Sequence, residues 1–246
     1  KLRLALLGGL QQIEVGLRVK IGHTLGKRGA LAHLDPTTLG ARASEFRPQK
    51  SSKGKKMTHY DFWRKEYDAH QRNARKERQE SVLHFINHYN KEVPIWAAVE
   101  FMPFGRLVSL LELLEPKDQN RISRDLGIKA QEILLGWLRP LNVLRNHCAH
   151  SNRVWNRPIV FQADKLNPCM LLFPELLDHL QASPEATVDR RRVYFHAATA
   201  AYLLRAIDPD ASWGDEFVSV MKGFPEHVRK FKLSPERSMG FTDDWD

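Results

Sequence analysis

The chain has 246 residues, 42% of them hydrophobic, and is therefore long enough to bury a substantial core. Its 38 lysines and arginines outnumber 29 aspartates and glutamates, and the formal net charge of +9 suits a nucleic acid or another polyanion as partner. Two cysteines cannot build a disulfide framework and no apolar run reaches membrane-spanning length, so we expect a cytoplasmic protein without a membrane segment.

Apolar residues recur at spacings of three and four along most of the chain, and this period predicts α-helices. The first helix is expected over residues 2–28, where Glu14 and Arg18 stand four apart, as in an intrahelical ion pair. Alternation typical of strands is nearly absent, apart from a weak pattern over residues 157–162, so the expected fold class is all-α. Further helices are predicted over 60–92, 107–116, 129–157, 187–206 and 211–223, with Pro94, Pro116 and Pro158 ending the first three of these.

Residues 47–78 carry most of the net charge, because they hold eleven lysines or arginines and four acids, and eleven minus four is +7. The first part, "RPQKSSKGKK", predicts a loop, and the second interleaves Tyr60, Phe62, Trp63 and Tyr67 with charges. Cations bind phosphates and aromatic rings stack on unpaired bases, which favours RNA binding. The alternative is an ordinary exposed loop and a helix whose aromatics face the core. The candidate RNA contacts are Lys50, Lys53, Lys55, Lys56, Arg64, Lys65, Arg72 and Arg75.

The segment "RNHCAHSNRVWNR" (145–157) contains Arg145 and His150 in the pattern R-x4-H. The spacing alone is weak, because six of the eleven histidines have an arginine at this or the next spacing. The context is stronger, since no acid occurs between Glu132 and Asp164. On a helix wheel the polar residues share one stripe and the apolar ones a second, core-facing stripe. The polar stripe is Asn142, Asn146, His150 and Arg153, and the apolar stripe is Leu141, Leu144, Cys148 and Trp155.

The chemistry that fits these residues is RNA cleavage without a metal. A ribose 2′-hydroxyl attacks the adjacent phosphorus, leaving a 2′,3′-cyclic phosphate and a 5′-hydroxyl. Histidine can act as the base or the acid, and arginine holds the phosphate oxygens. A zinc site at His147, Cys148 and His150 is disfavoured because structural zinc takes four ligands. One histidine can hardly serve both sides of an in-line attack, so we expect a two-fold homodimer with a composite site.

Four segments resemble the Abi-like (abortive infection, AbiD/AbiF-type) family of the HEPN superfamily. They are "LQQIEVGLRVKI", "VPIWAAVEFMPFGRLVSLLELL", "LRNHCAHSNRVWNR" and "MGFTDDWD", in the family's order and over nearly the whole chain. The resemblance implies a HEPN-like helical bundle with extra helices, forming a single domain over 1–246. Residues 47–80 would be a basic loop and helix insertion, and the family domain would have a further segment ahead of the first helix.

The resemblance also implies a function in phage defence, with Arg145 and His150 as the catalytic pair of an endoribonuclease and Asn146 as the polar residue beside them. His147, Arg153 and Arg157 would contact RNA, and neither a cofactor nor a metal is expected. Two alternatives stay open. One is a scaffold that holds a structured non-coding RNA without cutting it. The other is a toxin kept inactive by a partner RNA or protein.

Overall fold

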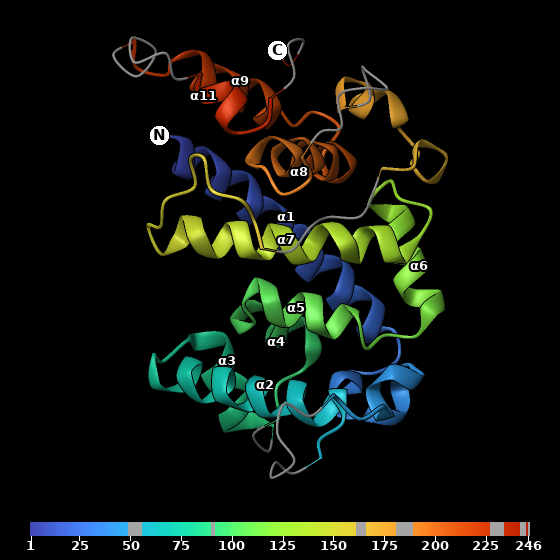
Figure 1. Cartoon of the computed structure of the whole chain (residues 1–246). Coiled ribbons are helices and arrows are strands. Elements are labelled where there is room, and N and C mark those ends of the chain that lie inside the picture. Colours follow the sequence, from blue (N-terminus) through green and yellow to red (C-terminus); the bar gives the residue numbers. More distant parts are fainter. Residues whose placement is uncertain are drawn as a thin grey trace. The chain divides into compact units, whose positions relative to one another are not determined.

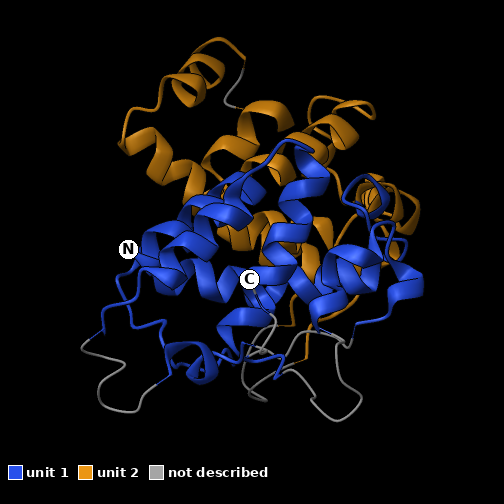
Figure 2. Ribbon diagram, turned by 90° about the horizontal axis from the view of Figure 1, so that it is seen from above, with its two compact units in different colours: residues 1–14, 123–246 blue, residues 15–122 orange. Residues whose placement is uncertain are grey.

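The computed structural model describes residues 1–48, 56–89, 92–160, 166–180, 189–226, 234–241 and 245 (Figure 1). Within these ranges the protein is all-α, as predicted, and its β-type pairings are two isolated bridges, Phe46 with Thr58 and Ile128 with Leu171. The chain forms two compact units (Figure 2). Unit 1 contains residues 1–14 and 123–246, and unit 2 contains residues 15–122.

Unit 1 holds the first half of α1, whose full extent is Leu2–Gly26, and the helices that follow residue 123. Trp213 packs closely on α1, with its Nε1 donating to the carbonyl of Ala5 at 2.8 Å. Gly9 permits this approach, because a Cβ there would lie 2.5 Å from the indole. The other helices of the unit are α7 (Gln131–Ala149), η4 (Pro168–Met170), η5 (Pro174–Leu180), α8 (Val193–Ile207), α9 (Trp213–Lys222) and α11 (Pro235–Ser238).

The core of unit 2 contains a cluster of aromatic rings. Trp63 and Tyr67 stack at 5.2 Å between ring centroids, and His33 meets Tyr67 edge-on at 5.4 Å. A capping box at Thr58 and Asp61 starts the helix that carries Trp63 and Tyr67. The unit's elements after α1 are η1 (Ala32–Leu34), η2 (Pro36–Thr38), η3 (Ala41–Ser44), α2 (His59–Lys76), α3 (Glu80–His88), α4 (Ile95–Phe101), α5 (Phe104–Leu111) and most of α6 (Pro116–Asp125).

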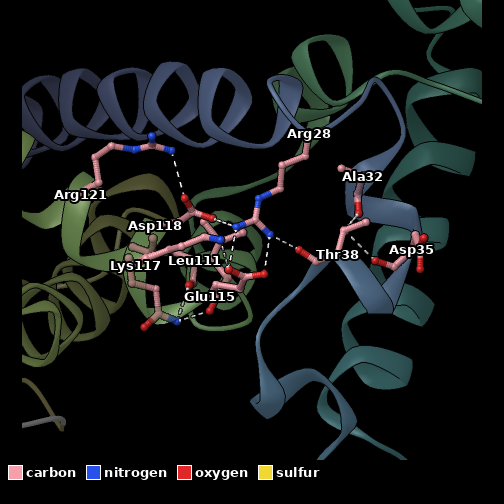
Figure 3. A network of polar contacts seen from close by, with 11 residues as sticks. Arg28, Ala32, Asp35, Thr38, Leu111, Glu115, Lys117, Asp118 and Arg121 are labelled. Atoms are coloured by element: carbon pink, nitrogen blue, oxygen red, sulfur yellow. Dashed lines mark hydrogen bonds and ion pairs between the residues drawn. The ribbon is translucent and has the colours of Figure 1, made fainter.

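A polar network in unit 2 fastens the segment after α1 to the start of α6 (Figure 3). The guanidinium of Arg28 pairs with Glu115 at 3.1 Å and also with the buried carboxylate of Asp118. It donates as well to the carbonyl of Thr38. Arg121 approaches Asp118 from the other side at 3.0 Å, so the buried acid is shared by two cations.

Three predicted helix boundaries are wrong. The helix expected over 60–92 is two helices, broken where Arg78 adopts a left-handed φ of +56°. Pro116 is the first residue of α6 and does not end a helix. Proline is favoured at this position, because the N–H groups of the first turn have no partner within the helix and proline has no N–H. The helix expected over 129–157 runs through Pro140 but ends at Ala149.

The helix expected from 187 to 206 is confirmed in its body, although α8 begins at Val193, and α9 confirms the helix expected over 211–223. Residues 187 and 188, where the first of these helices was expected to begin, lie outside the described residues. The weak strand-like pattern at 157–162 forms no strand over the part that is described.

Candidate functional site

Arg145 lies near the end of α7 and forms an ion pair with an acidic residue from a distant part of the chain. Its Nε donates to Oε2 of Glu14 at 3.2 Å. Both residues belong to unit 1, and their side chains are 24% and 4% exposed. The arginine is therefore held by a buried carboxylate from α1, 131 residues earlier in the chain.

The sequence offered one signal for Glu14. On the wheel of α1 it falls beside Leu10, Leu17 and Ile21, which are all buried, so a carboxylate occupies the core-facing side of the helix. A buried carboxylate requires a cation or hydrogen-bond donors. The i, i+4 spacing predicts Arg18 as a partner of Glu14, and the packing of α1 and α7 adds Arg145, 131 residues away in the chain.

His150 is the C-cap of α7 and lies exposed, so a phosphate can approach its imidazole. Ser151 follows in the left-handed region at φ +56°. Its N–H donates to Cys148 at 3.2 Å and the N–H of Asn152 donates to His147 at 2.9 Å, the two bonds of a Schellman motif. Arg3, at the start of α1, donates to the carbonyl of Ser151 and binds the turn to the helix.

This turn changes the predicted polar stripe. Asn142 is half-buried and Asn146 exposed on α7, and His150 caps the helix. Arg153, which was expected on the same stripe, lies beyond the helix in an exposed loop. Trp155, expected on the core-facing stripe, lies in that loop as well, half-buried.

Two residues between Arg145 and His150 are partly or fully buried. His147 is half-buried, and burial, followed by the charge of Arg157, lowers the pKa of its imidazole. Burial raises the pKa of the Cys148 thiol to about 11, so this cysteine stays protonated, as its predicted place in the core suggests. Across the described residues, no three His, Cys, Asp or Glu side chains come together in a way that could hold a metal ion.

The loop after His150 is anchored to the segment before α8. Arg192 donates from Nη1 to the side-chain oxygen of Asn156 at 3.0 Å, and the N–H of Ile159 donates to the carbonyl of Arg191 at 2.7 Å. Asn156 has a left-handed φ of +50°, which asparagine tolerates better than most residues. The loop is thus held at its start, by Arg3, and at its end.

The basic segment belongs to unit 2, whereas the R-x4-H motif belongs to unit 1. Lys50, Lys53 and Lys55 lie outside the described residues. Arg64 is half-buried and pairs with Asp68 at 2.9 Å. The other four candidate RNA contacts are exposed cations: Lys56, Lys65, Arg72 and Arg75.

The aromatic residues of this segment do not form a stacking surface for bases. Tyr60, Trp63 and Tyr67 are buried in the unit 2 core, which confirms the alternative interpretation for these three rings. Phe62 is half-buried, and the guanidinium of Arg47 covers its ring at 3.5 Å. The exposed cations of α2, Lys65, Arg72 and Arg75, thus remain accessible to phosphates, while its buried rings stabilise the unit.

Comparison with known protein families identifies the family of this chain. The family described as Abi-like protein matches residues 1–156, from α1 through the R-x4-H motif. No curated protein and no solved structure matches the chain. Among the helices that the structure describes, none has both the length and the apolar composition needed to cross a membrane.

Proposed function

This chain belongs to the Abi-like family of abortive-infection phage-defence proteins, and from that premise we propose that it is a metal-independent endoribonuclease. The observation that carries the proposal is the end of α7. An exposed imidazole, His150, caps the helix, and a guanidinium, Arg145, is held in a fixed orientation one turn earlier. These are the two chemical groups that RNA cleavage through the 2′-hydroxyl requires.

Each group has a defined role in this reaction. The imidazole of His150 takes the proton of the 2′-hydroxyl or gives a proton to the departing 5′-oxygen. The guanidinium of Arg145 binds the non-bridging oxygens, on which charge develops as the phosphorus becomes five-coordinate. Because Glu14 engages Nε, the two Nη groups are the donors that would hold the phosphate. Asn146, exposed on the same turn, would orient the substrate by hydrogen bonding.

The geometry of in-line displacement extends the proposal to a homodimer. The attacking and leaving oxygens lie on opposite sides of phosphorus, so one copy of His150 serves each side in a two-fold assembly. An apolar surface in unit 2 favours self-association. Val15 and Val19 of α1 and Trp96 of α4 are 54%, 63% and 52% exposed, and they line a groove of about 670 Å³. Lys27 and Glu100 also line the groove, so a second copy could pair opposite charges across it.

Cleavage assays in EDTA test the reaction. The wild-type protein is expected to cut labelled RNA and to leave 2′,3′-cyclic phosphate ends, and His150→Ala or Arg145→Ala is expected to abolish cutting. His88→Ala is the matched control, because His88 is an exposed histidine at the end of α3 in the other unit. Cutting that persists in His150→Ala, or that stops in EDTA, would contradict the mechanism.

Light scattering tests the dimer separately. Val19→Glu puts a charge in the groove and should shift the protein toward the monomer with a parallel loss of cutting. A wild-type monomer that still cuts RNA would rule out the composite site.

A non-cleaving RNA scaffold is the second candidate, because the exposed cations of α2 are concentrated in a different unit from the motif. In that case RNA stays intact at stoichiometric protein and co-purifies with it. Reversing the charge of Lys65, Arg72 and Arg75 would then release the RNA. A toxin held inactive by a partner would instead become active when the partner is removed.

A further inference from the structure

Two histidines lie one helical turn apart near the end of α3 in unit 2 (Figure 1). His84 and His88 are both exposed, and they are four residues apart in a continuous α-helix. Side chains at this spacing project from the same face of a helix, with Cβ atoms ~5–6 Å apart. The two imidazole rings are 5.1 Å apart between centroids, so they lie next to one another on the surface. The pair is separate from the R-x4-H motif, which belongs to unit 1.

The separation of the two rings agrees with the geometry of two imidazoles on one zinc ion. Zinc binds a histidine nitrogen at ~2.0–2.1 Å, which puts the centroid of that ring about 3.2 Å from the metal. Two rings at the tetrahedral angle are then about 5.2 Å apart between centroids. The 5.1 Å between His84 and His88 is close to this value. Rotation about the side-chain torsions can therefore direct one nitrogen of each ring to a common ion, while the helix stays in place.

Aromatic neighbours restrict the first of the two imidazoles. The ring of His84 meets Phe85 edge-on at 5.2 Å and lies 6.0 Å from the ring of Tyr89, between centroids. Such contacts limit the rotamers of a side chain before a ligand arrives, and so reduce the entropy that binding costs. Glu80 precedes His84 by one turn, but in the described part of the chain no third His, Cys, Asp or Glu side chain joins the pair. Water would therefore complete the coordination of the ion, as it does at open zinc sites.

We propose that His84 and His88 bind one zinc ion and that the bound ion stabilises α3. Imidazole nitrogen is a good ligand for zinc, whereas magnesium and calcium prefer oxygen. With nine residues α3 is shorter than a helix that is stable by itself in water, and Val82 is its buried residue. An ion held by two successive turns favours the helical form of this segment, because the helix keeps the two rings together. This inference does not depend on the proposed ribonuclease function.

Calorimetry with zinc chloride measures the binding. The full chain is prepared without a polyhistidine tag and is freed of metal before the titration. The wild-type protein should bind one zinc ion per chain, and magnesium chloride should give no binding. His84→Ala and His88→Ala should each weaken zinc binding more than about tenfold, because a single imidazole remains and the chelate is lost. His23→Ala is the matched control, since His23 is an exposed histidine on α1 in the same unit, and it should bind zinc as the wild type does.

Amide hydrogen exchange measures the effect on the helix. Zinc should slow exchange over residues 80–88 of the wild type but not of His88→Ala, and it should leave α2 unchanged in both. Circular dichroism without zinc checks that the variants fold. Equal zinc affinity in the wild type, His84→Ala and His88→Ala would overturn the proposal, and so would exchange in α3 that zinc does not alter. The cleavage assays are done in EDTA, so RNA cutting there is expected whether or not this zinc site exists.

Discussion

The ion pair between Glu14 and Arg145 gives the most direct prediction about stability. At the 3.2 Å that separates Nε from Oε2, opposite charges attract by about 5 kcal/mol at an effective dielectric constant of ~20. Loss of hydration offsets much of this, because the Glu14 side chain is only 4% exposed and that of Arg145 only 24%. We expect Glu14→Ala to lower the free energy of unfolding by about 2–3 kcal/mol, since it leaves the guanidinium partly buried without its acid. The coupling energy between the two residues should be about 1–2 kcal/mol.

Urea unfolding of Glu14→Ala, Arg145→Ala and the double variant measures that coupling. The pair Arg64 and Asp68 is the control, because its side chains are 35% and 37% exposed and lie four apart on α2. Its coupling should be only about 0.3–0.5 kcal/mol. Equal coupling in the two pairs would mean that Glu14 does not hold Arg145. Glu14→Gln keeps an acceptor for Nε, so its RNA cutting should stay within a few-fold of wild type. Glu14→Ala should lose on the order of 100-fold, because the guanidinium is then misplaced.

Three further predictions concern stability. Ser151→Gly removes the cost of a left-handed φ of +56° and should raise the free energy of unfolding by about 1 kcal/mol; a lower urea midpoint would contradict this. Both ring nitrogens of His196 are buried without a partner, and burial lowers its pKa from 6.5 to about 4. The unfolded chain therefore binds a proton at a higher pH than the folded protein does. The free energy of unfolding should have its full value above pH 6.5 and fall by about 3 kcal/mol toward pH 4, with a weaker pH dependence in His196→Phe. Gly9→Ala sets a Cβ 2.5 Å from the Trp213 indole and should cost about 1–3 kcal/mol, whereas Gly8→Ala meets nothing within 4 Å and should not destabilise; equal thermal midpoints for the two would refute the close approach.

The sequence by itself determined the helical class, the first helix and the residues of the motif. Helical periodicity is a local property. Side chains three or four positions apart lie on the same face of a helix, whatever surrounds that helix. The apolar positions from Leu6 to Ile21 are therefore sufficient to define α1 and its buried face. The family resemblance likewise depends on short segments that can be compared without knowing the fold, and the match over residues 1–156 confirms it.

Tertiary structure decided where α7 ends and what holds its arginine. Ser151 and Asn152 favour turns, but such a preference does not by itself fix where a helix ends, and the contact of Arg3 with Ser151 supports the turn. The partner of Arg145 lies 131 residues away, and no periodicity connects two positions so distant. Such pairs arise when packing brings two helices together and leaves a buried charge that must be neutralised. The hydrophobic periodicity predicts single helices, whereas the contact between Glu14 and Arg145 forms between two helices.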